Sequence, residues 1–116
     1  MEVRVRDTGR GDVVLSPAGE IDMSTVGVLE TALTAALNRP DLRECLVDLA
    51  EVTFLDSTGL RVLIEGFSLA QERGRSLRVA NPQPVVERVL RITSVGPLLG
   101  LPDVATPLPP DARWLG

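Results

Sequence analysis

Three small polar residues, Asp56, Ser57 and Thr58, stand together between two apolar runs in the stretch LVDLAEVTFLDSTGLRVLIEG. A carboxylate or hydroxyl at such a junction can cap a helix by accepting hydrogen bonds from its first N–H groups. One cap needs one side chain, so at least one hydroxyl is left without a structural role. Ser57 lies at the predicted helix start, where the N–H groups and the helix dipole would tolerate a phosphate. The pattern therefore predicts that Ser57 is well placed to accept a phosphate.

The composition of the chain excludes several kinds of chemistry. The 116 residues include no His, no Tyr and no Lys, so all 12 basic residues are Arg. A Ser-His-Asp hydrolase, a Schiff-base lysine and a Walker lysine are therefore excluded. A net charge of −4 and few aromatic residues argue against nucleic-acid binding. We predict that the chain is not an enzyme and that it holds no cofactor.

Two other residues and the chain start bear on the same question. Cys45 is the single cysteine, which suits the cytoplasm, and we expect it to be a small core residue. Asp48 has no predicted partner carboxylate, so we expect a structural role and not a metal site. No apolar run approaches the roughly 20 residues that cross a bilayer, and the start MEVRVRDTG lacks the apolar segment of a secretory signal. We therefore predict a cytoplasmic protein with no membrane contact.

Hydrophobic patterning predicts strands that alternate with helices. We expect strands at residues 2–6, 13–21, 44–49 and 76–80 and helices within residues 22–38, 57–73 and 82–92. The run 44–49 is almost continuously apolar, which is typical of a strand covered on both faces. Pro17 cannot donate to a ladder, so it predicts an edge position or a bulge in the second strand.

Polar residues and glycines predict where these helices begin and end. Asp22 or Ser24 can cap the first helix, and Asn38 can end it. Gly74 lies where a glycine usually closes a helix such as the second one. We expect Asn81 to cap the third helix, with Pro82 as its first residue.

The order of elements predicts a mostly parallel α/β sheet with helices packed on it. Right-handed crossovers bring the strand-to-helix loops to the carboxyl edge of such a sheet, where ligands and partners bind. We expect three loops to meet there and to form a partner-binding surface. Its predicted residues are Asp22, Ser24 and Thr25, then Asp56, Ser57, Thr58 and Gly59, and finally Asn81.

Two motifs carry a family resemblance. The residues GEID at 19–22 and FLDSTGL at 54–60 resemble the STAS domains of bacterial anti-sigma factor antagonists. The resemblance covers about residues 3–101 of a single domain, 1–116. The family often closes with an amphipathic helix, whereas residues 102–116, which end in PLPPDARWLG, have a poor helical pattern and form a tail. The resemblance implies the STAS fold, an α/β fold with a four- to five-stranded, mostly parallel sheet and helices mainly on one side.

The resemblance also implies a function and partners. In this family, the serine that matches Ser57 is phosphorylated by an anti-sigma factor kinase with a histidine-kinase-like ATPase fold. The unmodified antagonist captures that kinase and frees the sigma factor, and a PP2C-type phosphatase restores the serine. Asp22 would lie in the recognition surface near Ser57. Two alternatives stay open: a STAS scaffold or sensor subunit without a serine switch, and a small hydrolase that uses Ser57 with a carboxylate.

Overall fold

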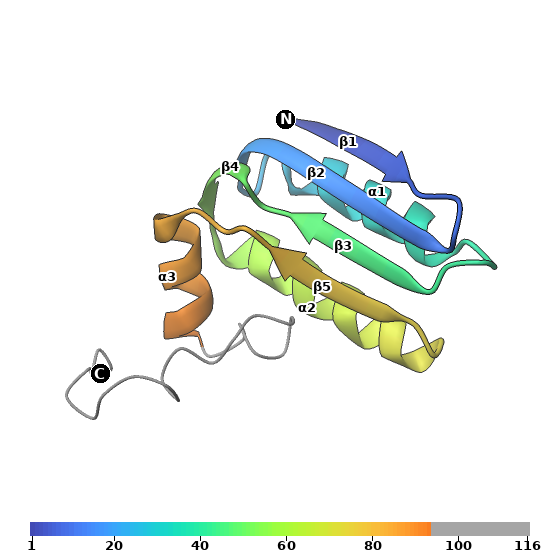
Figure 1. Ribbon diagram of the computed structural model, residues 1–116. Helices are drawn as coiled ribbons and strands as arrows, with labels where there is room; N and C mark the ends of the chain where they lie inside the picture. Colours follow the sequence, from blue (N-terminus) through green and yellow to red (C-terminus); the bar gives the residue numbers. More distant parts are fainter. Residues whose placement is uncertain (94–116) are drawn as a thin grey trace, which may run out of the picture.

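The computed structural model describes residues 1–93, which form a five-stranded mixed sheet and three helices (Figure 1). In chain order the elements are β1 (Glu2–Asp7), β2 (Asp12–Ile21), α1 (Val26–Leu37), β3 (Glu44–Asp48), β4 (Glu51–Leu55), α2 (Ser57–Glu72), β5 (Ser76–Ala80) and α3 (Pro84–Ile92). The predicted tail and the predicted end of the domain core near residue 101 lie outside the described residues. None of the helices in residues 1–93 has the length and hydropathy of a membrane span.

Strand β2 organises the sheet because it pairs with three other strands. It is antiparallel to β1 and parallel to β3 and β4, and β5 follows beyond β3. Along its length β2 changes its parallel partner: residues 12–15 pair with β3 and residues 18–21 pair with β4. Pro17 lies in the gap between the two partners, and the register shifts between Gly19 and Glu20. The predicted edge position is therefore wrong, because β2 is an interior strand with its irregularity two residues later.

The structure has two strands where the sequence predicted one. A short turn at Leu49 and Ala50 separates β3 from β4, and the Ala50 N–H donates to the Asp48 carboxylate at 3.0 Å. Beyond this turn, β4 lies beside the second half of β2, with Leu55 opposite Ile21. The extra strand thus carries the motif that begins at Asp56 to the end of β2.

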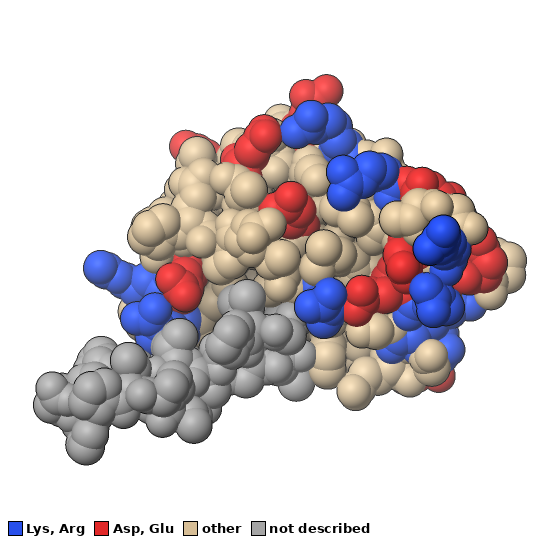
Figure 2. Space-filling model, in the orientation of Figure 1, with Lys and Arg blue, Asp and Glu red and all other residues tan. Residues whose placement is uncertain are grey.

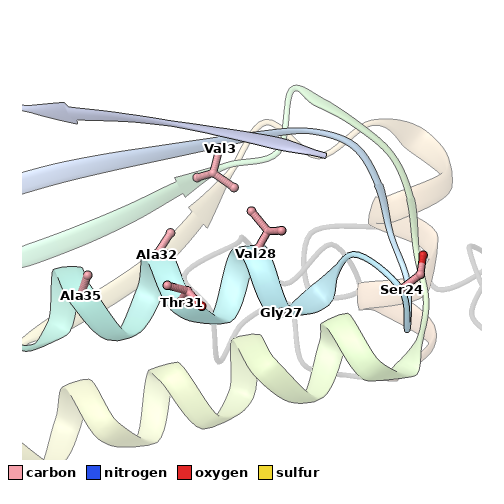
Figure 3. A pocket seen from close by; sticks show the side chains of 7 residues that line it. All are labelled: Val3, Ser24, Gly27, Val28, Thr31, Ala32 and Ala35. Atoms are coloured by element: carbon pink, nitrogen blue, oxygen red, sulfur yellow. The ribbon is translucent and has the colours of Figure 1, made fainter.

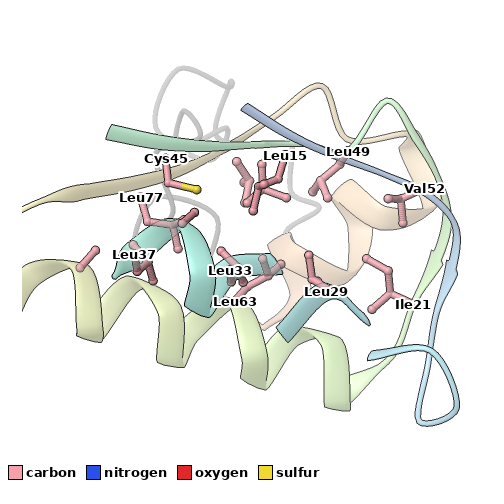
Figure 4. Close-up of a cluster of buried hydrophobic side chains, with 14 of the residues drawn as sticks. Leu15, Ile21, Leu29, Leu33, Leu37, Cys45, Leu49, Val52, Leu63 and Leu77 are labelled. Carbon is pink, nitrogen blue, oxygen red and sulfur yellow. The ribbon is translucent and has the colours of Figure 1, made fainter. Parts of the chain in front are cut away.

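One face of the sheet supplies the core. Along β3 and β5 every second side chain is buried, and these residues pack with leucines of α1, α2 and α3 in one cluster (Figure 4). The buried cluster includes Leu15, Leu29, Leu33, Cys45, Val47, Leu63, Leu77, Val79, Val86 and Leu90. Cys45 is therefore a core residue, as predicted, and burial raises the pKa of its thiol to about 12.

The other face of the sheet remains open. The residues of β3 on this face, Glu44, Leu46 and Asp48, are only partly buried, so β3 is not covered on both faces as its apolar run predicted. Ion pairs cross between strands there, from Arg78 to Glu44 at 2.7 Å and from Arg4 to Glu51 at 3.1 Å. Figure 2 shows acidic and basic side chains interspersed over this side of the molecule.

The ends of the helices confirm two predictions and correct one. Helix α1 ends at Asn38, and α2 closes at Gly74, whose φ is 69°. Helix α3, however, begins at Pro84 after Gln83, so the predicted cap at Asn81 is wrong. A residue before proline avoids the helical region, and Gln83 accordingly has ψ of 159°. The side chain of Asn81 instead donates to the Asp48 carboxylate at 3.2 Å.

Close packing at Gly59 fixes the position of α2 on the sheet. A Cβ atom at this residue would lie 2.5 Å from Ile21 Cγ2 and 2.5 Å from Leu55 Cδ1. We expect Gly59→Ala to lower the free energy of unfolding by about 1–3 kcal/mol through overpacking, measured by urea unfolding. The matched control is Gly27→Ala in α1, where nothing lies within 4 Å of the new Cβ. It should be neutral or stabilising by up to about 1 kcal/mol. A Gly59→Ala protein as stable as the control would contradict the close approach.

Candidate functional site

Two of the three predicted loops meet where β2 and β4 end. The Asp56 N–H donates to the Ile21 carbonyl at 3.1 Å, so the segments that lead into α1 and α2 are held side by side. Across this junction the charge of Asp22 acts to raise the pKa of Asp56, although hydrogen bonds keep that pKa lowered overall.

The third loop does not join them. Strand β5 ends with Ala80 opposite Asp48, before β4 begins. Strand β4 separates Asp48 from the start of α2. Its five residues, at about 3.3 Å each, span about 16 Å. Asn81 is exposed and bonds to Asp48, so it lies apart from the Ser57 loop. The sequence did not reveal this separation because it did not resolve β3 from β4.

The Asp56 carboxylate caps α2. Its Oδ1 atom accepts hydrogen bonds from the Thr58 N–H at 2.9 Å, the Gly59 N–H at 3.2 Å and the Thr58 hydroxyl. The hydroxyl bond is the largest cause of a lowered pKa for the Asp56 carboxyl, and the two backbone donors add to it. One carboxylate and one hydroxyl thus supply the cap that the motif predicted.

The Asp22 carboxylate holds the loop before α1 in a similar way. Its Oδ1 atom accepts from the Ser24 N–H at 2.9 Å, the Ser24 hydroxyl at 2.8 Å and the Thr25 N–H at 3.2 Å. The Ser24 hydroxyl is the largest cause of a lowered pKa for Asp22. The N-cap residue itself is Thr25, whose side chain makes no capping bond and donates instead to the Glu20 carbonyl at 2.7 Å. Asp22 and Ser24 therefore order the turn that precedes the helix and do not cap it.

Ser57 is the hydroxyl that remains free. It is the first residue of α2, its side chain is exposed, and its hydroxyl makes no hydrogen bond within residues 1–93. Thr58 is occupied by the Asp56 carboxylate, and Ser24 by the Asp22 carboxylate. The inference that one hydroxyl of the motif has no structural role is confirmed, and that hydroxyl belongs to Ser57.

The remaining predicted site residues contribute mainly support. Gly59 is buried, and its lack of a side chain lets α2 approach β2 and β4. Thr25 and Thr58 are half-buried and bond to their own loops. The exposed polar positions at this edge are Ser24 and Ser57, with the two partly exposed carboxylates between them.

Two exposed apolar residues beside these loops were missed. Met23, between Asp22 and Ser24, is 79% exposed, and Phe54, two residues before Asp56, is 44% exposed. The sequence held a signal for Phe54, since Phe54 and Leu55 are consecutive apolar residues in a strand and cannot face the same side. Contiguous exposed apolar patches with a polar rim mark protein contact surfaces, whereas single exposed apolar side chains are ordinary.

A hollow in the surface lies apart from Ser57. A hollow between β1 and the outer side of α1 is lined by Val3, Ser24, Gly27, Val28, Thr31, Ala32 and Ala35 (Figure 3). It has no titratable side chain and does not include Ser57. In the described part of the chain no group of three Cys, Asp or Glu side chains could hold a metal ion. Ser57 is exposed and lies outside this hollow.

The lowered pKa of Asp56 makes its contribution to stability depend on pH. Because the pKa of Asp56 is lower in the folded than in the unfolded state, its ionised carboxylate stabilises the fold at pH values above the unfolded-state pKa. This stabilisation is lost as the pH falls through the folded-state pKa. Asn can cap a helix but carries no charge. We expect Asp56→Asn to melt below wild type at pH 7 and the difference to shrink below about pH 4. Ser57→Ala is the control and should melt like wild type throughout. A difference that is the same at every pH would contradict this account.

Known proteins share both the motifs and the fold. The family described as "Mlab, STAS domain" matches residues 5–100. The anti-sigma-B factor antagonist of Bacillus subtilis (strain 168) is 35% identical over 95 residues, which cover 81% of this chain and 82% of that protein. A solved anti-sigma factor antagonist from Mycobacterium paratuberculosis is 31% identical with a TM-score of 0.72, covering 86% of this chain and 83% of that one.

Structures of the anti-sigma factor antagonist SpoIIAA show the same fold at lower identity. The unphosphorylated form gives a TM-score of 0.73 at 20% identity, over 83% of this chain and 84% of that one. The phosphorylated form gives 0.67 at 19% identity, over 83% and 86%. These matches confirm the predicted α/β fold, and the family match confirms the resemblance that GEID and DSTGL indicated. The chain belongs to the STAS domain family.

Proposed function

We propose that this chain is an anti-sigma factor antagonist. In its unmodified form it binds an anti-sigma factor that has a histidine-kinase-like ATPase fold, and so releases the sigma factor that this kinase holds. Relatives that are named anti-sigma factor antagonists support the proposal. The observation that carries it is the free hydroxyl of Ser57, exposed at the first residue of α2 beside two carboxylates that their own loops hold in place.

The proposed contact surface surrounds this hydroxyl. It consists of Asp22 and Ser24 from one loop, and Asp56, Ser57 and Thr58 from the other. Met23 and Phe54 add exposed apolar area beside these polar groups, and buried apolar side chains within a polar rim are typical of protein interfaces. Thr25 and Gly59 support the surface from within. Asn81, at the level of Asp48, is proposed as an outlying contact of the same partner.

The charge of this surface indicates the charge of its partner. Asp22 and Asp56 lie close together, and neither carboxylate makes an ion pair with an arginine among residues 1–93. Complementary charge favours association and rejects wrong partners. We therefore expect the kinase surface around its ATP site to be positively charged where it meets these two loops.

Phosphorylation of Ser57 by the bound kinase would weaken binding between the two proteins. The Ser57 Oγ atom forms a bond to the γ-phosphorus of ATP as the bond from that phosphorus to the bridging oxygen breaks. The hydroxyl proton passes to a base on the kinase, and ADP leaves. The phosphate adds about −1.5 to −2 charges at neutral pH. An interface closed over Ser57 would have to bury this charge next to Asp56, which weakens binding. A PP2C-type phosphatase would hydrolyse the phosphate and restore the hydroxyl.

The direct test is phosphate transfer by the cognate kinase. Incubated with this kinase and ATP-Mg, the protein should gain one phosphate, and peptide mass spectrometry should place it on Ser57. Ser57→Ala should fold with the wild-type melting temperature, because the hydroxyl makes no hydrogen bond, and should take no label. Ser68→Ala, at an exposed position further along α2 and outside the contact surface, is the matched control and should be labelled.

Two outcomes would overturn the proposal. One is a phosphate that maps to Thr58 or Ser24, and the other is full labelling of the Ser57→Ala protein. A kinase that binds the protein tightly but never labels it would favour the alternative of a STAS scaffold or sensor subunit without a serine switch.

A further inference from the structure

A single arginine stands one helical turn from the free hydroxyl. Ser57 and Arg61 are four residues apart on α2, and both side chains are exposed. Residues at this spacing are neighbours on the same side of a helix. Arg61 makes no hydrogen bond or ion pair within the described chain, although Glu65 stands one turn further along. Its guanidinium is therefore available to a new partner.

The direction of helical side chains favours Ser57 as that partner. Side chains on an α-helix lean toward its N-terminus, so the long side chain of Arg61 can reach over the turn that holds Ser57, on the side away from Glu65. A guanidinium also presents its N–H donors in a planar fork that fits two oxygens of a phosphate. A phosphate on Ser57 would thus meet a matching donor group without any movement of the backbone.

Acidic groups otherwise dominate the surroundings of Ser57. Asp56 precedes it in the chain, and Asp22 interacts with Asp56. The other acidic side chains on the adjoining elements include Glu20 of β2, Glu30 of α1, Glu51 of β4 and Glu65 of α2, of which Glu51 pairs with Arg4. Negative neighbours oppose the second ionisation of a phosphate, which for phosphoserine lies near pH 6. At a pKa near 6 about a tenth of the phosphate is singly charged at pH 7, and acidic neighbours act to increase that fraction.

On the basis of the proposed phosphorylation of Ser57, we propose that Arg61 pairs with the phosphate and increases its doubly charged fraction at neutral pH. Arg61 is then a positioning residue of the switch: it holds the phosphate on the outer side of α2 and maintains the charge that the partner must reject. In the unmodified protein the same side chain has no bonded partner, so its role begins with phosphorylation.

The test measures the ionisation of the phosphate itself. Phosphoserine is incorporated at position 57 during translation, and the phosphorus NMR shift is followed with pH at low ionic strength, where a surface pair is least screened. We expect Arg61→Gln to raise the phosphate pKa by about 0.3 units, a twofold change in the ratio of the two ionisation states. Arg61→Lys should raise the phosphate pKa by less than Arg61→Gln, because lysine keeps the positive charge without the planar fork of arginine. Arg88→Gln, on the exposed side of α3, makes the same change in net charge and should leave the value unchanged.

Each outcome decides the proposal. An unchanged phosphate pKa in Arg61→Gln, or an equal shift in Arg88→Gln, would overturn the pairing. Melting of the unphosphorylated variants checks that each one folds. Because translation places the phosphate, the result does not depend on a kinase. Failure of the kinase to label Ser57 would count against the proposed function and leave the pairing intact. An unchanged phosphate pKa in Arg61→Gln would count against the pairing and leave the proposed function intact.

Discussion

The Asp56 carboxylate is the group on which the site depends. By accepting three hydrogen bonds from Thr58 and Gly59, it starts α2 and occupies the Thr58 hydroxyl. Ser57 lies between the capping residue Asp56 and the donor residues Thr58 and Gly59. Its side chain is exposed to solvent and takes no part in the cap. The same capping interaction that stabilises the helix therefore leaves one hydroxyl accessible. Under the proposed function, the DST motif would combine a structural and a functional role in adjacent residues.

The sheet brings the second carboxylate to this point. Because β2 exchanges β3 for β4 as its neighbour, the ends of β2 and β4 lie together, and the Asp56 N–H bonds to Ile21 just before Asp22. Gly59 then allows α2 to approach the same two strands. Both acidic loops are held by their own hydrogen bonds before any partner arrives. We therefore infer a preorganised surface, whose binding costs less ordering than that of a mobile loop.

The sequence predicted most features that rest on local rules, although the helix caps expected at Asn81 and at Asp22 or Ser24 were wrong, and it missed those that rest on long-range placement. The caps at Asp56 and Gly74, the buried Cys45 and the unassigned hydroxyl follow from residue type and spacing. The break between β3 and β4 did not, because Leu49 is apolar and keeps the run continuous, while only pairing with β2 separates the strands. That break also decides that Asn81 lies apart from Ser57. Burial on one face of β3 likewise depends on where the helices pack.

The central claim is that the Ser57 phosphate acts locally through its charge, and paired measurements on the phosphorylated protein test it most directly. One is its thermal melting, and the other is its affinity for the ADP-bound kinase. At the first turn of α2 a negative group favours the helix dipole, so the melting temperature should stay the same or rise slightly. Affinity should fall at least tenfold, which corresponds to about 1.4 kcal/mol. A large drop in melting temperature, or an unchanged affinity, would contradict the account.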